Sequence, residues 1–419
     1  MSLTDRPDKD VLVLGAGIIG VSVALHLQKR GRSVLLVDRR APGEETSYGN
    51  AGLIERASVV PYGFPREIAT LLKYATNRSA DVRFRWGFLP RLLPWIARFW
   101  FESSPRRLRR AAIDMLPLVE RSVVEHTELM AEAGVLHHAR RTGWIEAYRT
   151  QKAFAAARDA ARALDAFAIR YDFLGPEEFR AREPHLAGCF AGAVHWLDPV
   201  TVADPGGLVK DYAGLFLRKG GEIVKADAAS LAGGEGGWSI RTKDGTRRAR
   251  EAVVALGPWS DTVYRRLGYR VPLAVKRGYH VHIEPAGDAV LNHPVVDVER
   301  GYLLAPMTKG IRLTTGIEFA GRDEAPTPVQ VDRTEPHARA VFPLGRRVEP
   351  APWMGARPCL PDMRPIIGPA PRHEGLWFAF GHNHHGLTLG PVTGRLLAEM
   401  MTGEKPFADP APYAMSRFG

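Results

Sequence analysis

The spacing of apolar and polar residues predicts an ordered series of strands and helices that begins close to the N-terminus. Val11-Leu12-Val13-Leu14 is a short apolar run that predicts a buried strand. An apolar pattern with helical spacing follows it, and residues 34–37 predict a second buried strand. A strand, a helix and a second strand in this order predict a βαβ unit with parallel strands.

Further helices are predicted along the rest of the chain. One has clear end signals, because Asp204 suits its N-cap, Pro205 suits its first turn and Gly220 suits its end. The others are expected over residues 65–135, 152–166 and 391–401.

Predicted strands alternate with these helices. Asp244-Gly245 separates two of them and favours a tight hairpin turn, because glycine accepts positive φ. The strands are expected over residues 238–242, 247–250, 252–256, 279–283, 302–305 and 312–316. The whole pattern predicts a nucleotide-binding domain that is interrupted by a second domain with its own mixed sheet.

The turn inside the first βαβ unit carries the strongest chemical signal. It reads Gly15-Ala16-Gly17-Ile18-Ile19-Gly20, and the second strand ends on Asp38. These features form the dinucleotide-binding fingerprint, in which the glycines allow a tight turn, close approach of a pyrophosphate and close helix packing. The positive end of the helix would face the phosphates, and Asp38 would accept hydrogen bonds from ribose hydroxyls.

Composition limits the class of protein. The 419 residues are 45% hydrophobic and 25% charged, which is typical of a soluble globular protein, and this length predicts two domains. Cys189 and Cys359 cannot form a disulfide framework, and neither has the spacing of a metal site. The polar N-terminus lacks the apolar core of a secretory signal, and no apolar run is long enough to cross a membrane, so we expect a cytoplasmic protein.

The formal net charge of +11 allows two interpretations. The positive charge could attract an anionic partner such as nucleic acid, lipid or an acidic substrate, or it could belong to the solvated surface of an arginine-rich protein. Residues 82–110 mix aromatic side chains with arginines, which resembles an anchor on the inner membrane surface. Pro90 and Pro94 are expected to interrupt a helix there, and the aromatics equally suit a helical subdomain. Outside 82–110 the arginines lack the stripe of a nucleic-acid track, so no nucleic acid is expected.

Three further segments are rich in glycine, proline or small polar residues. The loop at residues 46–52 suits a backbone that wraps around a polar ligand, and residues 353–368 follow an irregular path. Residues 381–390 form a glycine-rich turn that leads into the last helix, whose free N–H groups favour an anion. A ligand held by segments more than 360 residues apart is easier to explain as a flavin than as a nicotinamide.

The chain resembles the D-amino-acid oxidase superfamily of FAD-dependent oxidoreductases over nearly its whole length, and within it the bacterial D-amino-acid dehydrogenases. The resemblance rests on the fingerprint with Asp38 and on the motifs at residues 47–52, 253–260, 276–280, 312–318, 357–362 and 381–390. It implies an α/β fold, in which a Rossmann-type FAD-binding domain is interleaved with a mixed-sheet α+β substrate domain. The FAD-binding domain would comprise residues 1–80, 190–275 and 355–419, and the substrate domain residues 81–189 and 276–354.

The resemblance implies FAD that is bound without a covalent link, since Cys359 does not match the cysteine of covalent members. The Gly386-Leu387-Thr388 backbone would face the pyrimidine side of the flavin and stabilise negative charge there. The expected FAD-binding residues are Gly15, Ala16, Gly17, Ile18, Ile19, Gly20, Asp38, Arg39, Arg40, Thr46, Ser47, Asn50, Ala51, Gly52, Gly257, Trp259, Gly381, His382, Gly386, Leu387 and Thr388.

The resemblance also implies candidates for the substrate side. Arg357 would clamp a substrate carboxylate as a bidentate partner, and Arg364 is the second candidate. Tyr279 would supply a hydroxyl to the same carboxylate. His384 and His385 would line the substrate side, where a neutral histidine can take a proton from the substrate ammonium.

The implied reaction is oxidation of a D-amino acid by hydride transfer from Cα to flavin N5. The resulting imine is hydrolysed to a 2-oxo acid and ammonia, and the electrons pass to a quinone-type acceptor, with residues 82–101 as a docking surface. The nearest alternative is an oxidase of glycine, sarcosine or another secondary amine, D-proline derivatives included, that uses oxygen. Two other classes stay open: a flavin-assisted RNA modifier, and a flavin subunit that acts only with partner chains.

Overall fold

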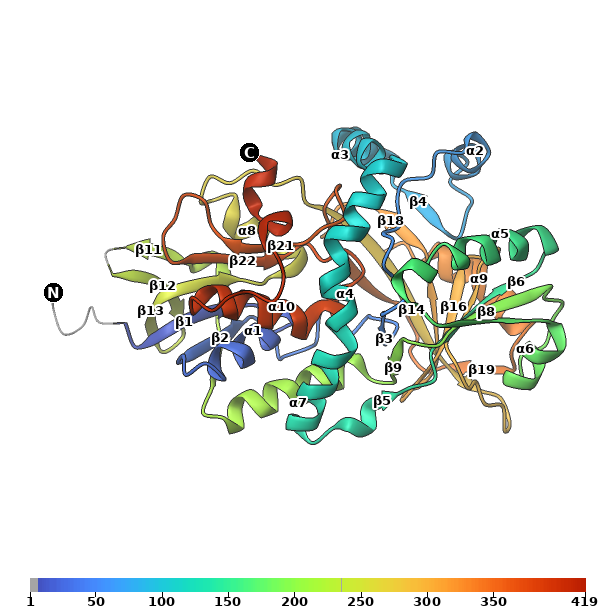
Figure 1. Cartoon of the computed structure of the whole chain (residues 1–419), viewed down its shortest axis with the longest axis horizontal. Coiled ribbons are helices and arrows are strands. Elements are labelled where there is room, and N and C mark those ends of the chain that lie inside the picture. Colours follow the sequence, from blue (N-terminus) through green and yellow to red (C-terminus); the bar gives the residue numbers. More distant parts are fainter. Residues whose placement is uncertain (1–6, 235) are drawn as a thin grey trace.

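A computed structural model describes residues 7–234 and 236–419 of the chain. Two large sheets stand side by side, with long helices over and between them (Figure 1). The first sheet lies in the left half of Figure 1 and the second in the right half, and helix α4 (Pro105–Ala133) runs between them.

The first sheet contains the predicted βαβ unit. Its path is β10 (Glu222–Lys225), β2 (Val34–Asp38), β1 (Lys9–Leu14), β13 (Gly245–Val254), β12 (Gly237–Thr242) and β11 (Ala232–Gly234), and β22 (Leu376–Phe380) with β21 (Ile366–Pro369) joins it at β13. Strands β10, β2, β1, β13 and β22 are parallel, so their carboxyl ends meet at one edge. The predicted hairpin is confirmed, because Thr242 pairs with Gly245 in antiparallel register. The two strands expected at 247–250 and 252–256 are one continuous strand.

The second sheet is mixed. Its path is β4 (Val82–Phe84), β18 (Ile317–Phe319), β14 (Ala274–Pro285), β17 (Gly310–Thr315), β16 (Tyr302–Met307), β15 (Val295–Asp297), β6 (Trp144–Tyr148), β8 (Gly192–Trp196) and β7 (Tyr171–Leu174), with β19 (Leu344–Arg347) and β20 (Trp353–Cys359) also on β14. A small sheet links β3 (Leu53–Ile54), β9 (Val200–Val202) and β5 (Ala139–Arg140).

The helices pack on these sheets. Helix α7 (Pro205–Arg218) begins as predicted, since the Asp204 carboxylate accepts the Gly207 N–H at 2.9 Å. The others are α1 (Ile18–Gln28), α2 (Ile68–Ala75), α3 (Leu89–Glu102), α5 (Gln151–Arg162), α6 (Pro176–Arg182), α8 (Asp261–Tyr264), α9 (Val329–Arg339) and α10 (Gly386–Met401).

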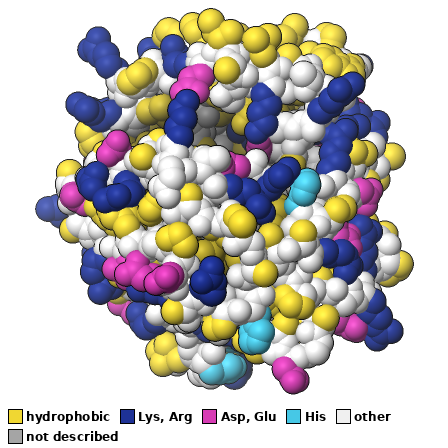
Figure 2. Space-filling model, turned by 90° about the vertical axis from the view of Figure 1, so that its right-hand side faces the viewer, with side chains coloured by type: hydrophobic (Ala, Val, Ile, Leu, Met, Phe, Trp, Pro, Cys, Tyr) yellow, Lys and Arg dark blue, Asp and Glu magenta, His cyan; other side chains and the backbone are white. Residues whose placement is uncertain are grey.

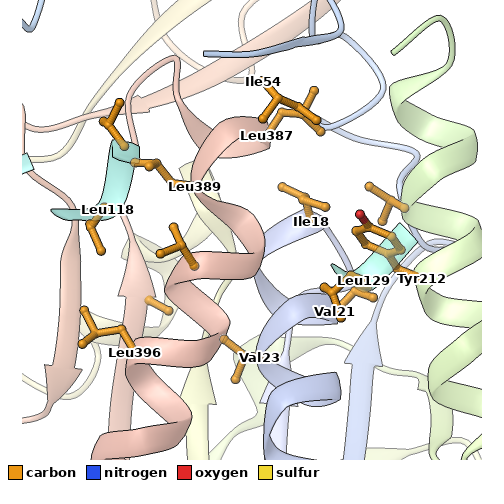
Figure 3. Close-up of a cluster of buried hydrophobic side chains, with 14 of the residues drawn as sticks. Ile18, Val21, Val23, Ile54, Leu118, Leu129, Tyr212, Leu387, Leu389 and Leu396 are labelled. Atoms are coloured by element: carbon orange, nitrogen blue, oxygen red, sulfur yellow. The ribbon is translucent and has the colours of Figure 1, made fainter. Parts of the chain in front are cut away.

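The two ends of the chain meet in one apolar core. Helices α1 and α10 lie side by side, and Ile18, Val21 and Leu387 are among the buried side chains between them (Figure 3). Burying a side chain of this size contributes about 1.5–3 kcal/mol, so this core holds both nucleotide-facing segments in place.

Several elements differ from the expectations. Strand β4 breaks the region expected to be helical at 65–135. Helix α3 continues through Pro94, and Pro90 lies in its first turn, where no N–H partner is needed. The prolines therefore do not interrupt this helix. Strands β8 and β20 belong to the second sheet although the expected FAD-binding segments contain β8 and most of β20, and α4 packs on α7 and α10 rather than with the substrate domain.

The last helix starts five residues earlier than expected, at Gly386 instead of Pro391. Pro391 has no N–H for the Leu387 carbonyl, which instead accepts a hydrogen bond from His126 Nε2 at 2.7 Å. A side chain from α4 thus replaces the missing backbone donor, and the helix can include the proline.

Candidate active site

A cavity of about 570 Å³ lies between the two large sheets. Its wall on the first sheet includes Gly15, Asp38 and Ala255, and its wall on the second sheet includes Gly278 and Thr314. The first turns of α1 and α10 also line it, so both of the predicted nucleotide-facing segments reach the same space.

The end of the cavity beside α1 is shaped by backbone. Gly15 has a φ of +107°, and a Cβ there would lie 2.4 Å from the Ala255 carbonyl oxygen. A Cβ on Gly20 would lie 1.7 Å from the Gly15 oxygen. Only glycine fits these two positions, so the tight turn and close packing expected from the fingerprint are present.

Asp38 lies at the same end with its carboxylate fixed. It accepts the Ala16 N–H at 2.6 Å and the Arg40 N–H at 2.9 Å. Ser47 joins the loop at 46–52 to this turn, because its hydroxyl oxygen accepts the Ile18 N–H at 3.0 Å. The carboxylate is thus held at the cavity wall before any ligand arrives.

The first turn of α10 forms another part of the wall, through Gly386, Leu387 and Thr388. A Cβ on Gly386 would meet no protein atom within 4 Å, so this glycine opens onto empty space. The Thr388 hydroxyl accepts the Glu55 N–H at 3.0 Å, which fixes the segment after β3 to the start of α10.

A row of register partners crosses the second sheet along the cavity. Trp353 pairs with His280, His280 with Thr314, Thr314 with Leu303, and Leu303 with Val296. All five line the cavity. His280 stacks on Trp353 with ring centroids 4.9 Å apart, and burial, with the Arg312 and His282 charges, lowers the pKa of His280 to about 2. This wall is therefore an uncharged surface.

Arg357 lies on β20 and lines the cavity. Within the described residues it makes no hydrogen bond or ion pair. Its guanidinium lies over Gly278 of β14, where a Cβ would come within 2.8 Å of Nη2. Burial lowers the pKa of Arg357, yet an arginine remains charged at neutral pH. A half-buried cation on a cavity wall, without a partner among the described residues, favours an anionic ligand.

Arg364 does not line the cavity. Its guanidinium pairs with Asp114 at 2.6 Å and with Asp362 at 3.2 Å, so its charge is already satisfied. Of the two arginines predicted to bind a substrate carboxylate, Arg364 is already paired within the protein and Arg357 is not. The geometry therefore favours Arg357 as the carboxylate-binding residue.

Tyr279 lines the cavity, but its hydroxyl is already occupied. It donates to Glu318 at 2.6 Å and accepts hydrogen bonds from Arg277 at 2.5 Å and from the Thr327 N–H at 3.0 Å. A hydroxyl has one proton, and this one is used within the protein. The geometry favours a structural role for Tyr279 over the expected contact with a substrate carboxylate.

The histidines before α10 are neutral. Burial, with the charges of His385, Arg357 and Lys276, holds the pKa of His384 well below its ordinary value. His384 lines the cavity and its Nε2 has no partner in the described residues. His385 does not line the cavity, and its Nε2 lies 2.9 Å from the Ser58 hydroxyl. Burial lowers the pKa of His385 to about 4 and that of His382, which contacts Thr393, to about 3.

Most of the expected FAD-binding residues line this cavity. They are Gly15, Gly17, Ile18, Ile19, Asp38, Arg39, Thr46, Ser47, Asn50, Ala51, Gly257, Trp259, His382, Gly386, Leu387 and Thr388. The remaining ones, Ala16, Gly20, Arg40, Gly52 and Gly381, lie outside its lining.

Sequence reasoning missed several lining residues. Glu55, Ser58 and Tyr62 follow the predicted loop at 46–52, and Trp144 comes from β6. Trp353 packs against Gly49, where a Cβ would lie 1.9 Å from its ring. The only signal for the first three was their closeness in sequence to a predicted ligand loop, whereas Trp144 is placed by long-range strand pairing.

Comparison with known proteins identifies the family. The family model described as FAD dependent oxidoreductase, DAO, matches residues 10–400. The chain belongs to the DAO family of FAD-dependent oxidoreductases.

The relatives share nearly the full length of the chain. A protein of Bradyrhizobium diazoefficiens named D-amino-acid oxidase is 31% identical, over 98% of this chain and 99% of its own. One of Paramagnetospirillum magneticum named D-amino acid dehydrogenase is 32% identical, over 94% and 95%. The glycine oxidase structure from Geobacillus kaustophilus has a TM-score of 0.75 at 21% identity, over 98% of each chain, which shows a shared fold.

The cavity fits the FAD of this family. The glycine turn excludes side chains at the α1 end, and the Asp38 carboxylate is held where a ribose would need acceptors. The open space at Gly386 lies beside the first turn of α10, whose N–H groups and positive helix end favour negative charge. The protein is thus an FAD-dependent oxidoreductase.

Proposed function

We propose that this enzyme oxidises D-amino acids to 2-oxo acids and ammonia. The observation that carries the proposal is Arg357, a half-buried cation on the cavity wall without a partner in the described residues. A carboxylate is its natural ligand, because the planar guanidinium binds both oxygens at once. The names of the two relatives at 31% and 32% identity support a D-amino acid as the owner of that carboxylate.

Each residue then has a defined task. Arg357 binds and orients the substrate carboxylate, and Gly278 leaves room for its guanidinium. Neutral His384, with a free Nε2 in the cavity, accepts a hydrogen bond from the substrate amine. Bound FAD supplies the acceptor for the hydride that leaves Cα. The uncharged wall of Trp353, His280 and Thr314 limits the water around the substrate.

We propose that FAD is held without a covalent link. Cys359 is buried at the end of β20, the strand that also carries Arg357, but it does not line the cavity. Burial raises the pKa of its thiol, which disfavours the reactive thiolate. Denaturation in acid should release all of the FAD into the supernatant.

We propose a quinone as the electron acceptor and the α2–α3 region as the surface that reaches a membrane. No helix of the described residues is long and apolar enough to cross one. Hydrophobic side chains gather at the top of the face in Figure 2, where Figure 1 places α2 and α3, with basic side chains nearby. Ile68 is 74% exposed and Trp86 59%, and Arg107 lies over the ring of Phe101 at 4.1 Å. Exposed apolar residues mixed with arginines are typical of a surface that binds lipid.

The second candidate is an oxidase that passes electrons to oxygen. It is favoured by the relative named D-amino-acid oxidase. Steady turnover of a D-amino acid with a quinone analogue and with oxygen alone separates the two. We expect fast reduction of the quinone and little peroxide, whereas one peroxide for each substrate would reject the dehydrogenase. Failure of every D-amino acid to react would reject the whole proposal.

A further inference from the structure

Glu55 is a buried acid on the cavity wall, directly after β3. Its side chain lines the cavity, and neither carboxyl oxygen has a hydrogen-bond partner in the described residues. The Trp144 indole N–H faces this carboxyl without the geometry of a hydrogen bond. Burying a carboxyl without a hydrogen-bond partner lowers the stability of the folded protein. An unpaired carboxyl at a ligand cavity therefore indicates that a ligand binds it.

A second carboxyl lies close by. Glu146 is at the centre of β6, on the same strand face as Trp144, and it pairs with Val296 of the cavity wall. The Tyr148 hydroxyl donates to Glu146 at 2.8 Å, and the charge of Glu146 acts on Glu55. Trp144 and Tyr62 line the cavity with Glu55, whereas Glu146 lies outside its lining. A lining carboxyl with a second carboxyl behind it and aromatic rings nearby suits a cation.

Arg357 does not neutralise the acidic residues of the cavity. Among the described residues it makes no ion pair with Glu55 or Glu146, so no N···O distance between them is within 4.0 Å. His384 has neighbours in both regions, because the charge of Arg357 acts on it and its ring centroid lies 5.0 Å from that of Tyr62. A ligand that satisfies both regions has an anion at one end and a cation at the other.

We propose that Glu55, with Glu146 beside it, binds the cationic side-chain end of the substrate, so that the enzyme prefers basic D-amino acids such as D-arginine and D-lysine. This inference rests on the proposed function, because Arg357 must hold the carboxylate of the same molecule.

The alternative cation, the α-ammonium group, fits this region less well. That amine must lose its proton before a hydride can leave Cα, and a pair of carboxylates would stabilise the unreactive ammonium form. A guanidinium or side-chain ammonium keeps its charge throughout the reaction, so the same carboxylates stabilise it at every step.

Protonation of Glu55 supports this assignment. Burial and the nearby Glu146 raise the pKa of Glu55 to about 8, so the carboxyl is mostly protonated at neutral pH without a bound cation. A bound guanidinium favours the ionised form. Binding of a basic substrate should therefore release a proton from Glu55, and a neutral substrate should not.

The kinetic test compares D-arginine with D-citrulline, a neutral molecule of the same shape, on the holoenzyme. For the wild type we expect a preference for D-arginine in kcat/KM of about 100-fold. Glu55→Gln, which keeps the shape of the protonated acid, should reduce that preference to about fivefold or less while D-citrulline turnover stays nearly unchanged. Glu128→Gln, on the exposed side of α4, is the matched control and should keep the full preference.

The binding test uses the chemically reduced holoenzyme without oxygen, so that no turnover occurs. Calorimetry with D-arginine in two buffers of different ionisation enthalpy gives the protons released at pH 7. The wild type should release about 0.9 proton more than Glu55→Gln, which is the protonated fraction of an acid with a pKa of about 8.

The outcomes separate this inference from the proposed function. If neutral D-amino acids react as well as basic ones and Glu55→Gln changes neither, the inference is wrong and the proposed function stands. If Glu55→Gln slows all substrates equally and shifts the flavin spectrum, Glu55 serves the cofactor and the inference is again wrong. If no D-amino acid of either kind reacts, the proposed function itself fails.

Discussion

The two ends of the cavity are built in different ways. At the α1 end the shape comes from backbone: Gly15 and Gly20 have no room for a side chain, and Asp38 is held by two N–H groups. At the opposite end the surface comes from side chains of distant elements, and the side chains of Arg357 and Glu55 have no hydrogen-bond partner in the part of the chain that the structure describes. The polar groups of the first end are paired within the protein, whereas the charge of Arg357 and the carboxyl of Glu55 at the second end are left for a ligand.

This difference assigns the two ends to two kinds of ligand. The family model describes an FAD-dependent oxidoreductase, so we expect the backbone-shaped end to hold FAD. We expect the end with the unpaired side chains to hold the substrate. Changes at the first end should therefore affect FAD retention, and changes at the second end should affect substrate preference.

The largest effect is expected for Arg357→Ala compared with Arg364→Ala. Loss of Arg357 removes a charge-assisted pair with the substrate, so KM should rise about 1000-fold. The amount of bound FAD and the melting temperature should stay unchanged. Loss of Arg364 leaves Asp114 and Asp362 without their partner, which should lower the free energy of unfolding by about 3 kcal/mol and leave KM unchanged. Steady-state kinetics and thermal unfolding measure both; an unchanged KM in Arg357→Ala contradicts the assignment.

Gly15→Ala tests the backbone end, with Gly31→Ala as its control. Both glycines have positive φ, but a Cβ at Gly31 meets nothing within 4 Å. The clash at Gly15 should lower the free energy of unfolding by about 3 kcal/mol and prevent FAD retention, against about 1 kcal/mol and full retention for Gly31→Ala. Bound flavin after dialysis is the measurement, and equal retention in both variants would show that the turn adapts.

The pH dependence of stability tests the unpaired state of Glu55. Its pKa is raised from 4.5 to about 8, so the folded protein holds a proton that the unfolded chain releases between these values. Stability therefore falls as pH rises through this window, by at most about 1.4 kcal/mol for each pH unit. Denaturant unfolding of the holoenzyme at pH 6 and pH 8 should show a smaller difference for Glu55→Gln than for the wild type. Identical differences would mean that Glu55 is ionised in the folded protein.

A smaller effect is expected for Gly278→Ala. The added methyl group meets the end of the Arg357 side chain, which can shift without disturbing the sheet. We expect KM to rise about fivefold, which corresponds to a loss of about 1 kcal/mol in substrate binding. We expect kcat and the free energy of unfolding to stay unchanged. A KM equal to that of the wild type would indicate that Arg357 holds the carboxylate from another position.

The sequence predicted correctly those features that depend on interactions between residues close together in the chain. The fingerprint, the Asp244-Gly245 hairpin and the capped start of α7 depend on residues a few positions apart, and all three are present. The start of α10 was misplaced because Pro391 is accommodated by His126, a residue from a distant helix.

The substrate end was harder to predict. Arg357 and Arg364 are seven positions apart and chemically identical in the sequence, and only tertiary pairing distinguishes them. Glu55 and Trp144 meet because strands β3 and β6 belong to different sheets that close over one cavity. The spacing of residues along the sequence does not predict such a contact between distant strands.

Anaerobic mixing of the purified holoenzyme with a panel of D- and L-amino acids tests the central claim most directly. We predict that D-amino acids bleach the blue absorbance of the flavin and that the matching L-isomers and the decarboxylated amines do not. Bleaching by the amines as readily as by the D-amino acids, or by none of the panel, would contradict a cavity in which Arg357 holds the carboxylate of a D-amino acid beside FAD.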